Sequence, residues 1–378
     1  NFMDSSLCDL NSKGNLQTVP DAYNPDKEFD KVIHFTPYIK DMELQKVFDE
    51  WSIEIYGYEL NKRKPYTLIT AFFKILKKMK EEKVTIVRGR LPYLGSLYGS
   101  LAAKILRIPS VVSLGGNNRI AQDLTGVYHY KWRFLTNAIE VLTLKLCDAI
   151  IVPNRFTGKY VEELIGERSV RKKVRVIPWQ CEEIKGEDPG DQAVIDKFNL
   201  PSDVVIVPII GFINEYKFSD VLYKALLDWK PSASDKIVFL FLGDGALRPE
   251  GEKLFLDRAD IKFMGWQPRA VIHAILRRAG LVLVPMSGFV LLEAASVGKP
   301  VITSRVEWHS ELVEDTKTGL LVDPTSPQEW RVAIDKMLGD PDLAERMADA
   351  LRSEFLREYT PDRAKRLELD LYNSLVET

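Results

Sequence analysis

The sequence of 378 residues has few of the side chains that build metal centres and disulfide frameworks. It contains three cysteines, Cys8, Cys147 and Cys181, which lie far apart and form no CxxC pair, and only four histidines. Such an odd, scattered set argues against a disulfide framework or a zinc site and is typical of a reducing compartment. We therefore expect a cytoplasmic protein without a metal site.

Long apolar runs are also missing. No uninterrupted run of about 18 apolar residues occurs, so we expect no transmembrane helix. The start of the chain, NFMDSSLCDLNSKGN, lacks the basic beginning and the apolar core of a signal peptide. It also lacks a first β-strand, from which we expect that the natural chain begins earlier.

A strong charge of one sign is absent too. The net charge is −2, made up of +5 in residues 1–190 and −7 in the remainder. This mild asymmetry indicates neither a nucleic-acid binder nor an acidic tail. With 46% hydrophobic and 28% charged residues, the composition is that of a globular protein long enough for two cores.

What the chain does contain is two series of short apolar runs that alternate with helix-period segments. This alternation predicts βαβ units and parallel sheets. We predict an α/β fold of two Rossmann-like, doubly wound domains facing each other across a cleft, at residues 1–182 and 204–355. The polar stretch 183–203 is expected to be a linker, and residues 356–378 a terminal helix. Ligands of such domains bind at the carboxyl ends of the strands.

One stretch, SGFVLLEAASVGKPVI from Ser287 to Ile302, places a single carboxylate, Glu293, among apolar residues. A buried glutamate is costly unless something pairs with it. Ser287 and Gly288 occupy the turn before the helix, where free amides favour a phosphate. We interpret the unit as a nucleoside-diphosphate site with a ribose diol on Glu293. The alternative is a helix whose one polar residue is partly exposed or salt-bridged.

This stretch, followed by SELVEDTKTGLLVDP and preceded by FLGDGALR and IKFMGWQPRAVIHAILRRAGLVLVP, resembles the nucleotide-sugar motif of family 4 glycosyltransferases of the GT-B fold. The resemblance is specific from Val204 to Pro324. It is looser in the first half, through CDAIIVPNRFTGKYV and RVIPW. It also extends to the C-terminal helices, which in this family cross back to the first domain.

The resemblance implies a retaining transfer of a hexose from a nucleoside-diphosphate sugar to an acceptor hydroxyl. The second domain would bind the donor and the first the acceptor, without a metal or any cofactor besides the donor substrate. It also implies that the Glu293 carboxylate holds the donor ribose and that Lys217, in GFINEYK, neutralises the diphosphate. A fixed cation stabilises the charge that the leaving diphosphate gains.

Three positions depart from the family pattern. Phe212 stands where an arginine is usual, and Arg248 and Lys299 are candidate replacements. Pro285 stands where a second glutamate is frequent, so we expect Ser287, Gly288 and Phe289 to take over phosphate and sugar contacts. Gly115 stands where a histidine is frequent, and we expect its loop, with Gly116 and Asn117, to approach the ligand. These departures indicate either a rearranged or an inactive site, and we favour the first.

Other candidates lie around the same turns. Glu307, His309 and Glu311 in VEWHSEL are expected beside the donor, and His309 and Glu311 are candidates for catalysis. The alternative for His309 is a surface loop histidine. Trp266 either stacks on the donor base or packs in its loop, and Gly243 lies in the turn GDG that we expect near the donor. Asp340 in DPD is interpreted as a turn residue rather than part of a metal site.

The expected partners are a nucleotide sugar and a carbohydrate or lipid-linked acceptor, with no nucleic acid. Segment 67–83 carries five lysines beside an apolar side. It predicts either peripheral contact with the inner face of an anionic membrane or a helix packed on the sheet with its lysines in water. Two other functions stay open: a nucleotide-sugar 2-epimerase and a non-catalytic nucleotide-sugar-binding protein.

Overall fold

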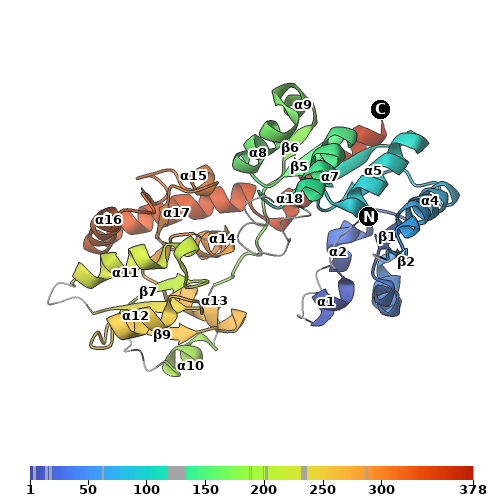
Figure 1. Cartoon of the computed structure of the whole chain (residues 1–378). Coiled ribbons are helices and arrows are strands. Elements are labelled where there is room, and N and C mark those ends of the chain that lie inside the picture. The colour runs from blue at the N-terminus through green and yellow to red at the C-terminus, as the bar shows by residue number, and fades with distance from the viewer. Residues whose placement is uncertain are drawn as a thin grey trace. The chain divides into compact units, whose positions relative to one another are not determined.

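The structure is a computed structural model that describes residues 1–2, 6–12, 16, 19–61, 64–117, 133–186, 188, 190–198, 200, 203–230, 236–286 and 288–377. Its chain forms two compact units (Figure 1). The first contains Asn1–Pro178 and Lys365–Thr378, and the second contains Trp179–Ala364.

The first unit is built on parallel strands. Strands β1 and β2 pair with each other, and β3, β4, β5 and β6 pair in that order. Phe2 lies between the two groups, with bridges to Phe35 and Gly89, in the place that a central strand would take. The strands are β1 (Val32–Thr36), β2 (Ile53–Gly57), β3 (Val87–Gly89), β4 (Ser110–Ser113), β5 (Ala149–Val152) and β6 (Val174–Val176).

Most helices of the first unit connect successive parallel strands, whereas the first two precede β1. They are α1 (Leu7–Ser12), α2 (Val19–Tyr23), α3 (Gln45–Phe48), α4 (Tyr66–Glu81), α5 (Leu94–Leu106), α7 (Arg133–Leu146), α8 (Arg155–Ile165) and α9 (Glu167–Lys173), with short 3-10 helices η2 (Pro25–Lys27), η3 (Ile39–Leu44) and η4 (Asp49–Trp51). Helix α4 packs against α5, and α5 against α7, so these three helices form one layer.

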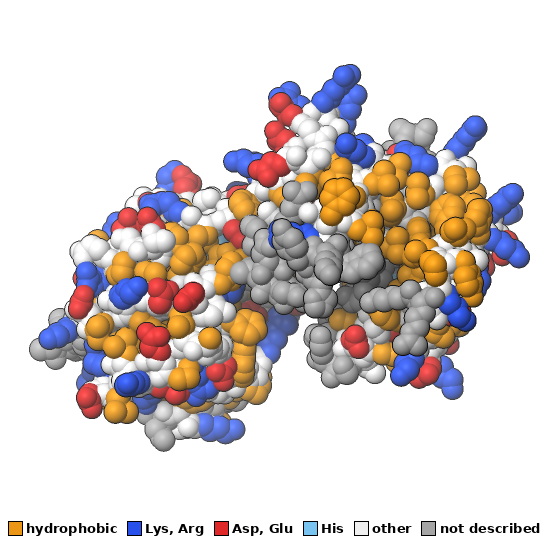
Figure 2. Space-filling model, in the orientation of Figure 1, with side chains coloured by type: hydrophobic (Ala, Val, Ile, Leu, Met, Phe, Trp, Pro, Cys, Tyr) orange, Lys and Arg blue, Asp and Glu red, His pale blue; other side chains and the backbone are white. Residues whose placement is uncertain are grey.

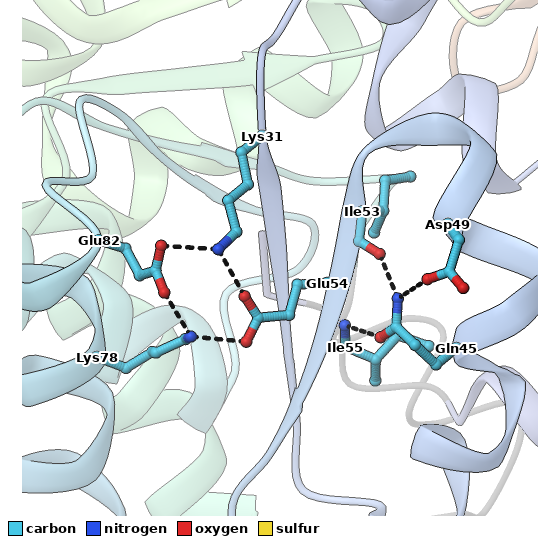
Figure 3. Close-up of polar contacts among 8 residues, drawn as sticks. All are labelled: Lys31, Gln45, Asp49, Ile53, Glu54, Ile55, Lys78 and Glu82. Atoms are coloured by element: carbon cyan, nitrogen blue, oxygen red, sulfur yellow. Dashed lines mark hydrogen bonds and ion pairs between the residues drawn. The ribbon is translucent and has the colours of Figure 1, made fainter.

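A closed ring of four charges ties α4 to the edge of the first sheet (Figure 3). The Lys31 ammonium contacts Glu54 at 2.8 Å and Glu82 at 2.7 Å, and the Lys78 ammonium contacts both carboxylates at 2.6 Å. Each charge thus has two opposite neighbours. Beside the ring, the side-chain amide of Gln45 donates to the carbonyl of Ile53 and accepts from the amide of Ile55. These bonds fix α3 against β2.

The ring predicts a pH dependence of stability. Its two lysines lower the pKa of Glu82 from 4.5 to about 2. A carboxyl group whose pKa is lower in the folded state stabilises the fold above its unfolded pKa, and this contribution is lost as the pH falls through the folded pKa. We therefore expect the difference in unfolding free energy between the native chain and Glu82→Gln to be constant near neutral pH. It should shrink as the pH falls from 4.5 to about 2.

Urea unfolding monitored by circular dichroism measures this difference. Glu59→Gln, at an exposed glutamate of the same unit, is the matched control and should cost little at any pH. A Glu82→Gln difference that persists undiminished at about pH 2 would contradict the role of the ring charges.

The second unit has one six-stranded sheet in which every pairing is parallel. The strand order is β12-β11-β10-β7-β8-β9. The order reverses between β7 and β10, which are the first and fourth strands of the unit and lie side by side. The strands are β7 (Val205–Ile210), β8 (Ile237–Leu242), β9 (Ile261–Gly265), β10 (Val282–Val284), β11 (Val301–Ser304) and β12 (Leu320–Val322). Ligands of doubly wound sheets bind at this type of switch point.

The helices of the second unit cover this sheet. They are α10 (Asp191–Asp196), η6 (Glu215–Lys217), α11 (Ser219–Asp228), α12 (Arg248–Leu254), α13 (Arg269–Arg278), α14 (Gly288–Val297), α15 (His309–Leu312), α16 (Pro327–Gly339), α17 (Pro341–Glu358) and α18 (Pro361–Val376), the last of which continues into the first unit. Helix α14 packs against α13, α17, β10 and β11. Residues Val290–Ser296 are buried for this reason, which explains their apolar composition.

Two parts of the chain differ from the expected boundaries. The stretch 183–203, expected to be a linker, contains α10, which packs against α13 through the pair of Asp191 with Arg277. It belongs to the second unit, and the division falls at Pro178 and Trp179 instead. At the other end, the segment that joins the first unit starts at Lys365 rather than at residue 356, and within it Glu368 pairs with Arg88 at 2.8 Å.

A helix suited to crossing a bilayer would have to be both long and apolar. Within the described ranges no helix meets these two conditions.

Candidate active site

The loop after β7 positions Lys217 at the carboxyl edge of the second sheet. The Asn214 side chain accepts a hydrogen bond from the Lys217 amide at 3.0 Å and thereby caps the short helix η6. Lys217 is half-buried, with its ammonium 5.4 Å from the centre of the Tyr216 ring. Burial lowers its pKa, and the charge of Glu307 opposes that shift. A partly desolvated cation is thus held next to the switch point.

The loop after β11 brings a carboxylate to the same place. Glu307 has a φ of +44°, a left-handed conformation that is uncommon for a residue other than glycine. The Tyr216 hydroxyl donates to its Oε1 at 3.4 Å. Burial raises the pKa of Glu307, while the Tyr216 hydrogen bond and the Lys217 charge lower it. Backbone strain held in this way is frequent at functional sites.

Lys217 and Glu307 come from strands on the two sides of β10, since β7 and β11 are its neighbours in the sheet. Each shifts the pKa of the other, although no direct ion pair joins these two described side chains. The arrangement therefore has one cation and one carboxylate near the turn that leads into α14. A ligand that carries both a phosphate and hydroxyl groups suits it.

The beginning of α14 is lined by aromatic rings. Phe289 is 57% exposed and stacks on Trp179, with ring centres 6.1 Å apart. Trp179 also meets the buried Trp308 edge to face at 5.2 Å. A Cβ atom at Gly288 would lie 3.0 Å from the Trp179 ring, so any side chain there would require this ring to shift by a few tenths of an ångström. Ser287, which we expected to contact phosphate and sugar, lies outside the described residues.

Glu293 is 8% exposed, and its partners lie on the neighbouring helix α13. Its Oε1 is 3.4 Å from the Arg269 guanidinium and 3.6 Å from His273 Nε2. Burial lowers the pKa of His273, and Arg269 Nε donates to its Nε2 at 3.2 Å, so the imidazole is neutral and Arg269 is the charged partner. The structure thus answers the question of what pairs with this carboxylate.

Sequence reasoning missed Arg269 and did not connect His273 with Glu293. The two side chains are four residues apart and therefore share one face of α13. That spacing was the available signal. The sequence does not tell which helix this face of α13 contacts. The structure shows that it packs against α14, which carries Glu293.

Two exposed aromatic side chains meet over the ends of β7, β8 and β9. Phe212 and Trp266 are 57% and 58% exposed, and their rings contact edge to face with centres 4.9 Å apart. Between their strands, Gly243 has a φ of +152°, and a Cβ atom there would lie 1.8 Å from the Gly211 carbonyl oxygen. Glycine at this position lets the loops after β7 and β8 approach closely. The exposed rings of Phe212 and Trp266 form an aromatic surface on which a planar ligand could stack.

The proposed substitutes for the missing arginine do not take its place. Arg248 pairs with Asp244 at 3.1 Å and with Glu252 at 2.8 Å, so its charge is already neutralised. Lys299 precedes β11 and so lies at the amino edge of the sheet, away from the carboxyl ends. Among these candidate cations, Lys217 is the one that the structure brings to the switch point.

His309 is 1% exposed, so it is neither a surface histidine nor accessible to a ligand. Its Nδ1 is 2.8 Å from the Thr303 hydroxyl, which itself donates to the carbonyl of Val284. Burial lowers its pKa to about 4, so the ring is neutral near pH 7. These bonds join β10, β11 and the loop that carries Glu307. The arrangement suits a positioning role and does not fit the expected catalytic contact.

The remaining candidates are scattered. Glu311 is half-buried on α15. Asp340 caps α17 by accepting from the Leu343 amide, as expected of a turn residue. Gly115, Gly116 and Asn117 follow β4 in the first unit, and a Cβ atom at either glycine would meet open space. Among the described residues, no group of three His, Cys, Asp or Glu side chains could hold a metal ion.

Comparisons with known proteins cover both units. Residues 31–179 match the protein-family model described as Glycosyltransferase Family 4. Residues 191–354 match the family model described as Glycosyl transferases group 1. The chain is 32% identical over 265 residues to the alpha-D-kanosaminyltransferase of Streptomyces kanamyceticus, a match that covers 67% of each chain.

It is 29% identical over 246 residues to a D-inositol 3-phosphate glycosyltransferase of Corynebacterium urealyticum. That match covers 60% of this chain and 57% of the relative, so the chain spans less than two thirds of that protein. Among solved structures, Anabaena Alr3699/HepE in complex with UDP superposes with a TM-score of 0.73 at 16% identity, covering 96% of both chains. At this identity the similarity shows the shared fold.

Proposed function

Because the chain belongs to the group 1 family of glycosyltransferases, we propose that it is a retaining hexosyltransferase with a nucleoside-diphosphate sugar as donor. In this reaction the bond between the sugar C1 and the diphosphate breaks, a bond from C1 to the acceptor oxygen forms, and the acceptor hydroxyl loses its proton. The observation that carries the proposal is the half-buried Lys217 at the switch point of the second sheet, close to the start of α14.

The donor diphosphate fits the turn between β10 and α14. The Lys217 ammonium supplies a positive charge from one side. The backbone amides of Gly288 and Phe289 lie at the start of α14. Helix starts favour phosphate because their amides are free and their dipole is positive. In this arrangement the fixed charge of Lys217 stabilises the diphosphate as it leaves.

The donor sugar is proposed to contact Glu307. Pro285 stands before α14 at the position where the family often has a glutamate, so this carboxylate is absent. The loop after β11 instead places Glu307 near Lys217 and Tyr216. A carboxylate accepts hydrogen bonds from two neighbouring sugar hydroxyls. The site is therefore rearranged in this chain, with its carboxylate supplied from another strand.

The donor nucleoside is proposed to lie between the exposed pair Phe212–Trp266 and Glu293. The aromatic pair offers a face on which a base can stack, and the Glu293 carboxylate accepts from the ribose diol while Arg269 holds it in place. The UDP complex of the Anabaena relative supports a uridine or similar nucleotide as ligand.

Glu293→Gln should weaken donor binding. The loss of a charge-assisted hydrogen bond to the ribose costs ~1.5–3 kcal/mol, about tenfold or more in affinity. Calorimetric titration of the full chain with nucleoside diphosphate measures the change. Glu252→Gln, at an exposed glutamate that pairs with Arg248, is the matched control and should bind normally. A Glu293→Gln variant with normal affinity and lowered stability would assign Glu293 to holding Arg269 alone.

A donor panel tests the proposed function. The full chain is incubated with UDP-, ADP-, GDP- and dTDP-hexoses and with free-sugar and lipid-linked sugar acceptors, and three products are measured separately: free nucleotide, new glycoside and epimerised nucleotide sugar. A glycoside whose anomeric configuration matches the donor supports the proposal. An epimer without glycoside would identify an epimerase, and nucleotide binding without turnover would identify a binding protein.

Sugar transfer is also expected to persist in excess EDTA. The phosphate charge can be met by Lys217 and by the amides of Gly288 and Phe289, which do the work of a metal ion in enzymes with carboxylate-bound Mg²⁺. Initial rates with and without EDTA check this. Complete loss of activity that Mg²⁺ or Mn²⁺ restores would contradict the proposed phosphate site.

A further inference from the structure

The outer surface of the layer α4–α5–α7 in the first unit is apolar (Figure 2). Space filling shows a continuous patch of hydrophobic side chains over these three helices, with lysine and arginine side chains along its rim. Its members are Tyr66, Ile69 and Phe73 on α4, Ile105 on α5, and Phe134, Leu135 and Leu142 on α7. Phe134 is 85% exposed, and each of the others is at least 46% exposed. We call this set the apolar patch.

The core of the unit does not account for the patch. On α4, Ala71, Ile75 and Met79 form the buried stripe that packs on the sheet. Ile69 and Phe73 lie on the opposite side, four residues apart, and are 64% and 59% exposed. Helix α4 is thus apolar on two faces. A contiguous exposed apolar surface of this kind marks an interaction site.

Positive charge continues the patch along the helices. On α4 the exposed stripe passes from Phe73 to Lys77 and Lys80, which follow at helical spacing. Because α4, α5 and α7 each connect parallel strands, they run in the same direction, and their C-terminal ends carry further basic residues. These are Lys104 and Arg107 at the end of α5 and Lys145 at the end of α7.

The acidic residues at this end are few and paired. Glu81 lies 3.7 Å from Lys77, and Asp148 lies beside Lys104. Glu82 is held in the charge ring with Lys31 and Lys78. The basic end therefore carries a net positive charge, and it adjoins the aromatic and aliphatic side chains of the apolar patch.

We propose that the apolar patch and its lysines dock on a bilayer that contains anionic lipids. Amphipathic helices that insert aromatic and aliphatic side chains at the headgroup boundary, and that carry lysines beside them, bind such surfaces. Each basic residue near the bilayer adds to the attraction for anionic headgroups. The charge of the rim is complementary to that of an anionic bilayer, and this complementarity selects the bilayer as the occupant of the patch.

Vesicle co-sedimentation of the full chain tests the proposal. The chain should bind vesicles of phosphatidylcholine with about one third phosphatidylglycerol and should bind pure phosphatidylcholine much more weakly, because anionic headgroups attract the lysines. The triple variant Ile69→Ser, Phe73→Ser, Phe134→Ser should lower the partition coefficient about tenfold or more. Replacing Lys77, Lys80 and the exposed Lys74 of the same helix by glutamine should lower it as well and weaken its dependence on salt.

Matched controls come from the second unit. Leu256 is 81% exposed there, and neither Leu256→Ser nor Lys253→Gln should change vesicle binding. Circular dichroism verifies that every variant is folded. Three results would overturn the proposal: no binding to anionic vesicles, undiminished binding of the serine variant, or self-association without lipid that the serine variant abolishes. The last result would assign the patch to contact between copies of the chain.

Discussion

Lys217→Ala should lower kcat on the order of 10²-fold or more, with a smaller change in KM. The lysine is half-buried, and it is the candidate cation that the structure brings to the switch point of the second sheet. In the proposed reaction its charge would act most strongly on the leaving diphosphate, which would become more negative as the C1–oxygen bond breaks. Steady-state kinetics with the donor identified by the panel measure the effect.

Lys224→Ala is the matched control, because Lys224 lies on the helix that follows Lys217 and pairs with Asp220 on the surface. Its kinetics should be those of the native chain. If Lys217→Ala turns over normally, the cation of the leaving group is supplied elsewhere and the proposed phosphate site is wrong. Burial lowers the pKa of Lys217, whereas an arginine keeps its positive charge when buried. Lys217→Arg therefore tests whether a positive charge at this position is sufficient for turnover.

Gly243→Ala should strongly destabilise the second unit. The added Cβ would lie 1.8 Å from the Gly211 carbonyl oxygen, and the φ of +152° is one that alanine rarely adopts. Overpacking and backbone strain each cost about 1–3 kcal/mol, so we expect a loss of roughly 3 kcal/mol and a fall in Tm of about 10 °C. Differential scanning calorimetry measures this change.

The same substitution should weaken donor binding. The loop that carries Gly211 leads to Phe212 and Lys217, and a displacement of Gly211 would move both. Gly339→Ala is the control, since a Cβ atom there meets nothing within 4 Å and Gly339 ends a helix. A Gly243→Ala chain with native Tm and native nucleotide affinity would show that the close approach of these loops is not required.

Much of the second unit could be predicted because its signals are local. The alternation of short apolar runs with helical segments is a property of consecutive residues, and it predicted the parallel α/β architecture that the structure confirms. The expected family is confirmed as well, by matches over residues 31–179 and 191–354, and the second of these ranges includes GFINEYK and GFVLLEAASVGKPV. The same motifs singled out Glu293 and Lys217.

Other features depend on side chains that are far apart in the chain. Arg269 reaches Glu293 only because α13 packs against α14. Glu307 meets Tyr216 only because β11 and β7 both flank β10. Packing also buries His309 against Thr303, which the loop composition did not reveal. Arg248 is different, because its partners Asp244 and Glu252 each lie four residues away, a spacing that the sequence itself contains.

The sequence by itself thus determined the fold class, the family, and the position of Glu293 and Lys217, the two residues on which the proposed chemistry rests. Periodicity and motif order carry this information because they are encoded within single elements. Only the tertiary structure decided which charges remain available at the switch point, which aromatic rings lie open, and which face of α4 meets solvent. Those properties arise from burial and pairing between elements, and the energy of a charged or apolar side chain depends on that environment more than on its neighbours in the chain.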